Sequence, residues 1–171
     1  MPLRHAGVTV ALLSVFVGAV GCAGTGTVSV PAPEPAADAA GICRTLADAL
    51  PGEVEERERR EVEPSSPYTA AWGDPAIVLR CGVPDPAVLD PPDAAYDPFA
   101  DAVAVNDVSW LIEAGANGDG YRFTTTERTV RVEVTVPSAY APETGVLVDL
   151  AEAVAGSVPL DPLWEDHTDH G

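Results

Sequence analysis

Two segments of the chain alternate regularly between apolar and polar residues. Every second residue in 130–136 is Val. In residues 76–83, the same period of two places Leu79 and Cys81 on the opposite side from Arg80. A period of two is typical of a β-strand that has one face in the core and one in solvent. We therefore expect both segments to be strands whose apolar faces are buried.

Two further strands are predicted on either side of a turn. Residues 108–112 (VSWLI) and 121–126 (YRFTTT) are rich in β-branched and aromatic residues, and 115–120 between them contains Asn-Gly and Asp-Gly. With the valine strand, they predict an antiparallel meander with one solvated side. The charged segment 53–63 has few apolar residues, and we interpret it as a solvated strand or loop.

A spacing of three and four residues predicts two helices. Ile42, Leu46 and Leu50 form an apolar stripe that ends at Pro51-Gly52. A second stripe follows Thr144, a candidate N-cap, and ends at Gly156; it comprises Val146, Leu147, Leu150, Ala151 and Val154. The expected fold is α+β, with two layers, in which two helices pack on one face of an antiparallel sheet.

Composition divides the chain into four regions. Residues 1–21 are predicted to be a signal peptide, and 22–40, rich in Pro, Ala and Gly, a disordered tether. Residues 41–160 are expected to form a single domain, followed by an acidic C-terminal tail at 161–171. The proline-rich stretch 84–98 is expected to be a surface loop inside the domain.

The N-terminal region predicts export and lipid attachment. The apolar run 8–20 follows Arg4 and His5 and is shorter than the roughly 20 residues that span a bilayer. It leads to Ala19-Val20-Gly21-Cys22, a pattern similar to the bacterial lipobox. We therefore expect acylation of Cys22 and anchoring at the extracytoplasmic face of the cell membrane. The alternatives are cleavage and soluble secretion, or an uncleaved anchor.

Cysteine arithmetic supports that prediction. The chain has three cysteines, an odd number for an exported protein. Lipid on Cys22 would leave Cys43, on the apolar face of the first helix, and Cys81, on the inward face of a strand. These two are predicted to form a disulfide in an oxidising compartment.

Charge excludes one class of partner. There are 27 acidic and 9 basic residues, all the latter Arg, giving a formal net charge of -18. Such a chain lacks the basic clusters that nucleic acids require. The negative net charge also argues against adsorption of the domain by itself to anionic lipid. We take the acidity as a source of solubility, with a halophilic habitat or loose cation binding as alternatives.

No catalytic constellation is recognisable. Beyond His5, the histidines are His167 and His170 in the predicted tail, which is not expected to hold a base within hydrogen-bond reach of a nucleophile. Asp74 alone among the acids has an apolar setting, and it is also a typical turn residue before Pro75. We expect no enzyme and no cofactor. The alternative is a carboxylate-dependent hydrolase or transferase acting on cell-wall material.

A metal site is not predicted either. The one candidate is the tail cluster formed by Glu165, Asp166, His167, Asp169 and His170. Without rigid support from neighbouring groups, such a cluster is more typical of a solvated acidic end.

A binding surface is predicted from Trp72, Arg80 and Arg131. Trp72 stands near Pro in an apparent loop, and the two arginines lie on the solvated faces of their strands. The alternatives are that Trp72 closes one end of the sheet, and that the arginines pair with local acids such as Glu133. A cell-envelope protein or a wall component would be the partner.

The block 71–83 (AWGDPAIVLRCGV) resembles the signature of an actinobacterial family of small secreted lipoproteins known only as a domain of unknown function. Arg60, 108–111 (VSWL), 123–125 (FTT) with Arg128, and Tyr140 extend the resemblance. It implies anchoring, a two-cysteine domain and a cell-envelope setting, but no activity. Ala19 stands where the lipobox usually has Leu. We expect a non-enzymatic binding or accessory module held to the membrane through Cys22.

Overall fold

The computed structural model describes residues 26–165. Cys22, the predicted signal peptide of residues 1–21 and the end of the acidic tail (166–171) lie outside the described residues. One antiparallel sheet of eight strands forms the body of the molecule, in the order β2-β3-β5-β6-β10-β9-β8-β7. Its strands are β2 (Glu53–Val54), β3 (Arg57–Arg60), β5 (Thr69–Trp72), β6 (Ile77–Cys81), β7 (Ala102–Val105), β8 (Val108–Ala114), β9 (Tyr121–Thr125) and β10 (Val132–Val136).

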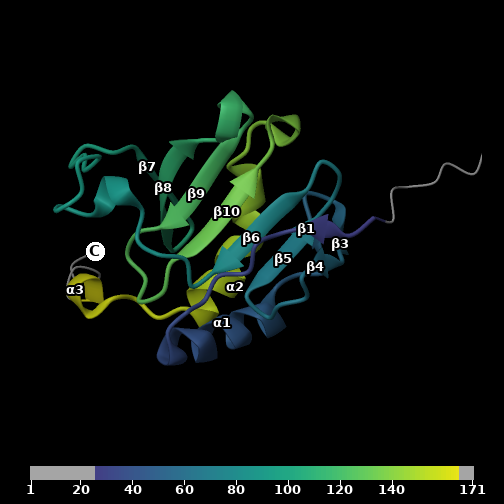
Figure 1. The fold of residues 1–171 in the computed structure, drawn as a ribbon, viewed down its shortest axis with the longest axis horizontal. Coiled ribbons are helices and arrows are strands. Elements are labelled where there is room, and N and C mark those ends of the chain that lie inside the picture. Colours follow the sequence, from purple (N-terminus) through teal and green to yellow (C-terminus); the bar gives the residue numbers. More distant parts are fainter. Residues whose placement is uncertain (1–25, 166–171) are drawn as a thin grey trace, which may run out of the picture.

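Two long helices cover one face of this sheet. They are α1 (Ala37–Ala49) and α2 (Gly145–Ser157), which pack against each other, and α2 also contacts β2, β7 and β8. Figure 1 shows both helices on the same side of the strands. The predicted α+β fold is therefore confirmed. A short helix, α3 (Pro162–Glu165), follows, and three 3₁₀ turns lie at Ala87–Leu89, Ala116–Gly118 and Ser138–Tyr140.

The core lies between the helices and the sheet, where the alternating patterns placed it. Val132, Val134 and Val136 are fully buried, and α2 contributes Leu147 and Leu150 from the opposite layer. Full burial of each such side chain contributes about 1.5–3 kcal/mol relative to exposure. The polar residues between the valines face the other side, so the one-sided sheet predicted from the sequence is confirmed.

The disulfide predicted between Cys43 and Cys81 is present, and it joins α1 to β6. The two Cα atoms are 5.6 Å apart, and both residues are 1% exposed. The bond spans 38 residues of sequence, a loop whose closure is worth about 3–4 kcal/mol on the chain-entropy model. It fastens the helical layer to the middle of the sheet.

Several element boundaries differ from the prediction. The first helix begins at Ala37, because the alanines before residue 41 are strong helix formers. Thr144 stands at the N-cap of α2, but its side chain makes no capping hydrogen bond. Gly156 does not end that helix, which continues to Ser157. Strands β5 and β7 were not predicted, because their small residues (TAAW and AVAV) lie next to turn and proline-rich segments.

The prediction of a disordered tether is wrong from Gly26 onward. Strand β1 (Val28–Ser29) pairs in parallel with β4 (Val62–Glu63), and the next residue, Val30, is only 3% exposed. The backbone amides of Val28 and Val30 donate to carbonyls of the β4 segment at 2.8 and 3.1 Å. From there the segment, purple in Figure 1, runs to the start of α1. Apolar residues within a proline-rich stretch thus add a strand to the domain.

The acidic tail is also structured at its beginning. The amide of Asp161 donates to the carbonyl of Glu127 at 2.9 Å, and Leu160 forms an isolated bridge with Arg128. The predicted domain end at residue 160 is therefore too early, since α3 extends to Glu165. Among residues 26–165, no helix is long and apolar enough to cross a bilayer.

Candidate functional site

Trp72 does not belong to a binding surface, contrary to the prediction. It lies on β5 opposite Ile77, faces the helices and is fully buried. Its indole Nε1 donates to the carbonyl of Pro51 at 3.1 Å, and the guanidinium of Arg59 lies 5.8 Å from the ring centre. Trp72 is instead a core side chain of a strand with neighbours on both sides, so the alternative that it closes one end of the sheet does not describe its place either. Because the turn residues Gly73-Asp74-Pro75 follow Trp72, the sequence predicted a loop where the structure has a strand.

The turn that follows Trp72 is held by two side chains from elsewhere in the chain. Arg60 Nη1 donates to the carbonyl of Gly73 at 2.9 Å, and the Tyr140 hydroxyl donates to the carbonyl of Pro75 at 2.7 Å. Gly73 has a φ of +69°, and a Cβ there would collide with the Tyr140 hydroxyl. Burial raises the pKa of Tyr140. Arg60 and Tyr140 therefore fix this part of the family-like block.

Asp74 is a turn residue and not a buried acid. Its side chain is 76% exposed, and its one ion pair is a long one, 3.9 Å to Arg60. Among the described residues, the buried polar side chains are those of Thr69, Thr124, Thr125 and Arg128, so none is a carboxylate. The same part of the chain contains no His, Cys, Asp and Glu group able to hold a metal ion. The absence of an enzyme activity stays a prediction from sequence.

Arg80 lies on the solvated face of the sheet, where it pairs with a neighbouring strand. Its Nη1 is 3.1 Å from Glu133 Oε1, and Glu133 also lies 4.0 Å from Arg122. Arg122 in turn pairs with Glu113 at 2.8 Å. Alternating charges thus run across β6, β10, β9 and β8. Arg80 is therefore not a free cation, and local pairing, the second alternative, holds.

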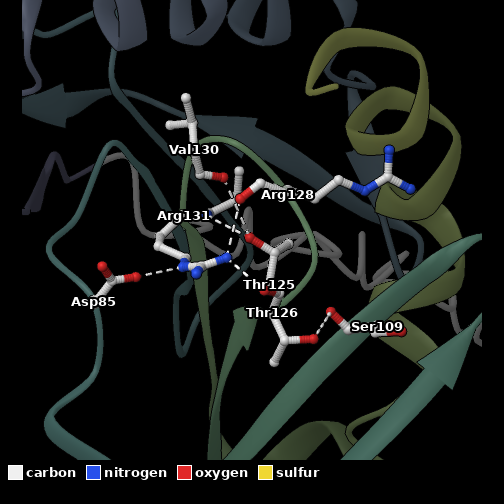
Figure 2. A network of polar contacts seen from close by, with 8 residues as sticks. Asp85, Ser109, Thr125, Thr126, Arg128, Val130 and Arg131 are labelled. Carbon is white, nitrogen blue, oxygen red and sulfur yellow. Dashed lines mark hydrogen bonds and ion pairs between the residues drawn. The ribbon is translucent and has the colours of Figure 1, made fainter. Parts of the chain in front are cut away.

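Arg131 is occupied in the same way, just before β10. Its Nε lies 2.6 Å from Asp85, and its Nη1 donates to the carbonyls of Thr126 and Arg128 at 2.6 and 3.0 Å. Figure 2 shows the guanidinium between the carboxylate and the loop that it closes. Arg131 therefore organises the 126–131 loop and the start of the 84–101 loop. It does not present its charge to solvent as an open binding group.

Arg128 is a buried cation that the sequence did not reveal. It is 5% exposed, and its guanidinium donates to the carbonyls of Val158 (2.9 Å), Ala155 (3.4 Å) and Asp107. Figure 2 shows its side chain extending toward α2, away from Arg131. Burial lowers the pKa of Arg128. A cation is favourable at the carbonyl end of a helix, and the last turn of α2 has no basic residue of its own. That empty last turn was the one available signal.

Arg80, Arg128 and Arg131 line one open pocket of about 520 Å³ beside the N-terminal segment. The three acidic residues that line the same pocket are Glu34, Asp85 and Asp161. The formal charges of the lining therefore cancel. This pocket gathers many polar groups, but it does not form the anion site that three arginines alone would suggest.

A different set of arginines has no carboxylate to pair with. Within residues 26–165, Arg57 and Arg59 on β3 and Arg44 on α1 form no ion pair, although the chain is strongly acidic. Arg44 donates to the Tyr68 hydroxyl at 3.2 Å. Arg59 lines a second open pocket, of about 300 Å³, together with Arg60, Glu61, Val62, Ser65, Ser66, Thr69 and Ala70. This pocket lies at the edge of the fold where the N-terminal segment joins β4.

Comparison with known proteins identifies a family without assigning an activity. Neither the curated proteins nor the solved structures include a significant match to this chain. A family model described as a protein of unknown function (DUF3515) matches residues 6–163, and so covers nearly all of the described fold. The chain belongs to this family of proteins of unknown function, DUF3515.

Proposed function

We propose that this protein is an exported lipoprotein, anchored by acyl chains on Cys22, whose domain is a binding or accessory module of the cell envelope. The observation that carries the proposal is the disulfide between Cys43 and Cys81. Such bonds persist in oxidising compartments outside the cytoplasm. With those two cysteines joined, Cys22 is left as the single unpaired thiol, directly after an apolar run of signal-peptide length.

The structure supports a binding role by what its surfaces offer. The solvated face of the sheet carries charged side chains in alternating pairs, led by Arg80–Glu133 and Arg122–Glu113. Their polar groups could recognise a protein or a wall component by complementary charges. An actinobacterial envelope setting, implied by the resemblance of residues 71–83 to a lipoprotein signature, is part of the proposal.

Mass spectrometry of the protein made in a lipoprotein-competent bacterium tests the anchoring. The expected mature N-terminus is Cys22 carrying a diacylglycerol mass, and the Cys43 and Cys81 peptides should be recovered as a disulfide. The matched control is Cys22→Ser, which keeps the domain and removes the acceptor thiol. An unacylated N-terminus in the parent protein, or free thiols at 43 and 81, contradicts the proposal.

Photo-crosslinking in intact cells tests the accessory role. The chain has no Lys, so amine-reactive crosslinkers are unsuitable. A photoreactive residue at Arg122, 44% exposed on the open sheet face, is compared with one at Val148, 54% exposed on α2. The proposal expects a reproducible envelope partner from position 122 and none from 148. Turnover of a wall fragment by the purified protein, with no partner captured, overturns it.

A further inference from the structure

The point at which the folded domain begins limits its distance from the proposed anchor. The chain is fixed to the domain from Gly26 and Val28 onward, by Arg60 Nη2 donating to the carbonyl of Gly26 and by the pairing of β1 with β4. Val28 is the sixth residue after Cys22, so the two Cα atoms can be at most about 20 Å apart even when the chain is fully extended. A lipid on Cys22 would therefore hold this edge of the domain close to the bilayer.

The edge concerned has a definite composition. We call it the anchor edge: Arg57 and Arg59 on one side of β3, Arg60 on the other side, and the pocket residues Ser65, Ser66 and Thr69. Arg59, Arg60 and the three hydroxyl residues line the open pocket of about 300 Å³, and one acid, Glu61, lines it as well. In Figure 1 the purple β1 and the neighbouring β3 and β4 lie at one end of the long axis, opposite the teal loop 84–101.

The chemistry of the anchor edge fits a phosphate. Guanidinium groups bind phosphate oxygens through paired N–H donors, and hydroxyls add further donors. Arg57 and Arg59 have no carboxylate partner among the described residues, and the ion pair of Arg60 is 3.9 Å long and solvent-exposed on the Asp74 side. Arg60 is occupied by the carbonyls of Gly73 and Gly26. Arg57 and Arg59 are therefore the arginines available to a ligand, although the guanidinium of Arg59 also lies 5.8 Å from the ring centre of Trp72.

We propose that the anchor edge docks onto the phosphate headgroups of the bilayer that holds Cys22. This inference rests on the proposed lipid anchor. The surrounding segment 53–63 also contains six Glu against its three Arg, and the whole chain is strongly acidic. Free in solution, the domain is not expected to adsorb. The anchor changes this, because a short link gives the edge a high effective concentration of headgroups, at which weak contacts suffice.

The test uses the complete lipidated protein on vesicles of phosphatidylcholine and phosphatidylglycerol. Energy transfer to headgroup acceptors is measured from a dye on a single introduced Lys, since the parent chain contains none and serves as the labelling background. Gly52→Lys places the dye beside the anchor edge, because the Gly52 carbonyl accepts from Arg59 and its Cβ position is open. Ala94→Lys places it in the exposed loop at the opposite end.

A lengthened link separates docking from simple tethering. Fifteen Gly/Ser residues are inserted after Ala23, and transfer from position 52 is expected to remain well above that from position 94. Arg59→Gln and Arg57→Gln should each lower the docking equilibrium about fivefold, the factor that corresponds to about 1 kcal/mol per basic residue at a membrane surface. Arg122→Gln, the same charge change on the sheet face, should leave docking unchanged.

The outcomes distinguish the two proposals. Protein that carries no lipid and does not float with vesicles overturns the anchoring itself. Lipidated protein that floats overturns the docking alone if the lengthened link equalises the two labels, or if Arg59→Gln behaves as Arg122→Gln does. Inorganic phosphate at constant ionic strength provides the last arm. Release of the domain at low millimolar phosphate would show a site for free phosphate, and this too would overturn docking to headgroups.

Discussion

The arginines of the central sheet and those of the anchor edge differ in their partners. Arg80 and Arg131 each contact a carboxylate at 3.1 Å or less, and Arg128 is enclosed by backbone carbonyls. Arg57 and Arg59 have no carboxylate partner among the described residues. In so acidic a chain, pairing is easy to arrange, so its absence at one edge is informative. The first group holds the fold together, whereas the second leaves its charge accessible.

Among the arginine substitutions, removal of Arg128 should lower the free energy of unfolding the most. Arg128→Met leaves the carbonyls of Val158, Ala155 and Asp107 without their donor in a buried setting. Hydrogen bonds to charged groups contribute about 1.5–3 kcal/mol each, and we expect the free energy of unfolding to fall by about 3 kcal/mol. Urea denaturation followed by circular dichroism measures it. A loss below about 1 kcal/mol would mean that Arg128 is not structural.

Detaching the N-terminal segment should have the second largest effect on the free energy of unfolding. Val30→Asp places a charge where the side chain is 3% exposed, and should cost about 2 kcal/mol of the free energy of unfolding. It should also release β1 from β4, so that hydrogen exchange at the Val28 and Val30 amides becomes fast. Val30→Thr is the milder control. Unchanged protection of these amides in Val30→Asp would contradict the packing described for residues 26–36.

Tyr140→Phe tests the turn beside the anchor edge. Loss of the hydrogen bond to the Pro75 carbonyl should cost about 1 kcal/mol at neutral pH. Because the pKa of Tyr140 is raised in the fold, its contribution is complete below the unfolded value near 10 and decreases as pH rises through the folded value. The stability difference between parent and variant should therefore shrink at high pH. A difference that grows with pH would contradict the raised pKa of Tyr140 in the fold.

The smallest effects should come from the exposed arginines themselves. Arg59→Gln should change the free energy of unfolding by less than about 0.5 kcal/mol. Arg80→Gln should lower it by up to about 1 kcal/mol, because the ion pair with Glu133 is lost. High salt should reduce the second effect and leave the first unchanged. Thermal denaturation of both variants at low and high salt measures this. Equal costs and equal salt dependence would remove the distinction between the two groups.

Prediction from sequence succeeded where one local pattern determined the environment of a residue. The valines of 130–136 could only bury one face, and Cys81 shared the inward face of its strand with Leu79. Cys43 followed from the stripe of the first helix. Two independent periodicities therefore placed both thiols in facing layers, and the disulfide resulted.

Prediction failed where long-range contacts decided the outcome. Trp72 precedes a Gly-Asp-Pro turn, and only its pairing with Ile77 across the sheet shows that it points inward. The strand at Val28–Ser29 depends on β4, more than thirty residues later. Arg128 finds its carbonyl partners on a helix end that lies far along the chain. Of the three residues predicted to form the binding surface, Arg80 and Arg131 line one pocket but are paired, and the unpaired arginines at β3 were overlooked within a charged segment.

The two-residue pairing of β1 with β4 also has a mechanical meaning. The strands are parallel, and force applied at the N-terminal end would first act on this short ladder. Its rupture would be the first step in detaching residues 28–36, whose fully extended length is about 30 Å, before α1 is loaded. The covalent link from Cys43 to the central strand then stops further unravelling. The segment before α1 would thus extend under force before the disulfide-linked part of the domain bears the load.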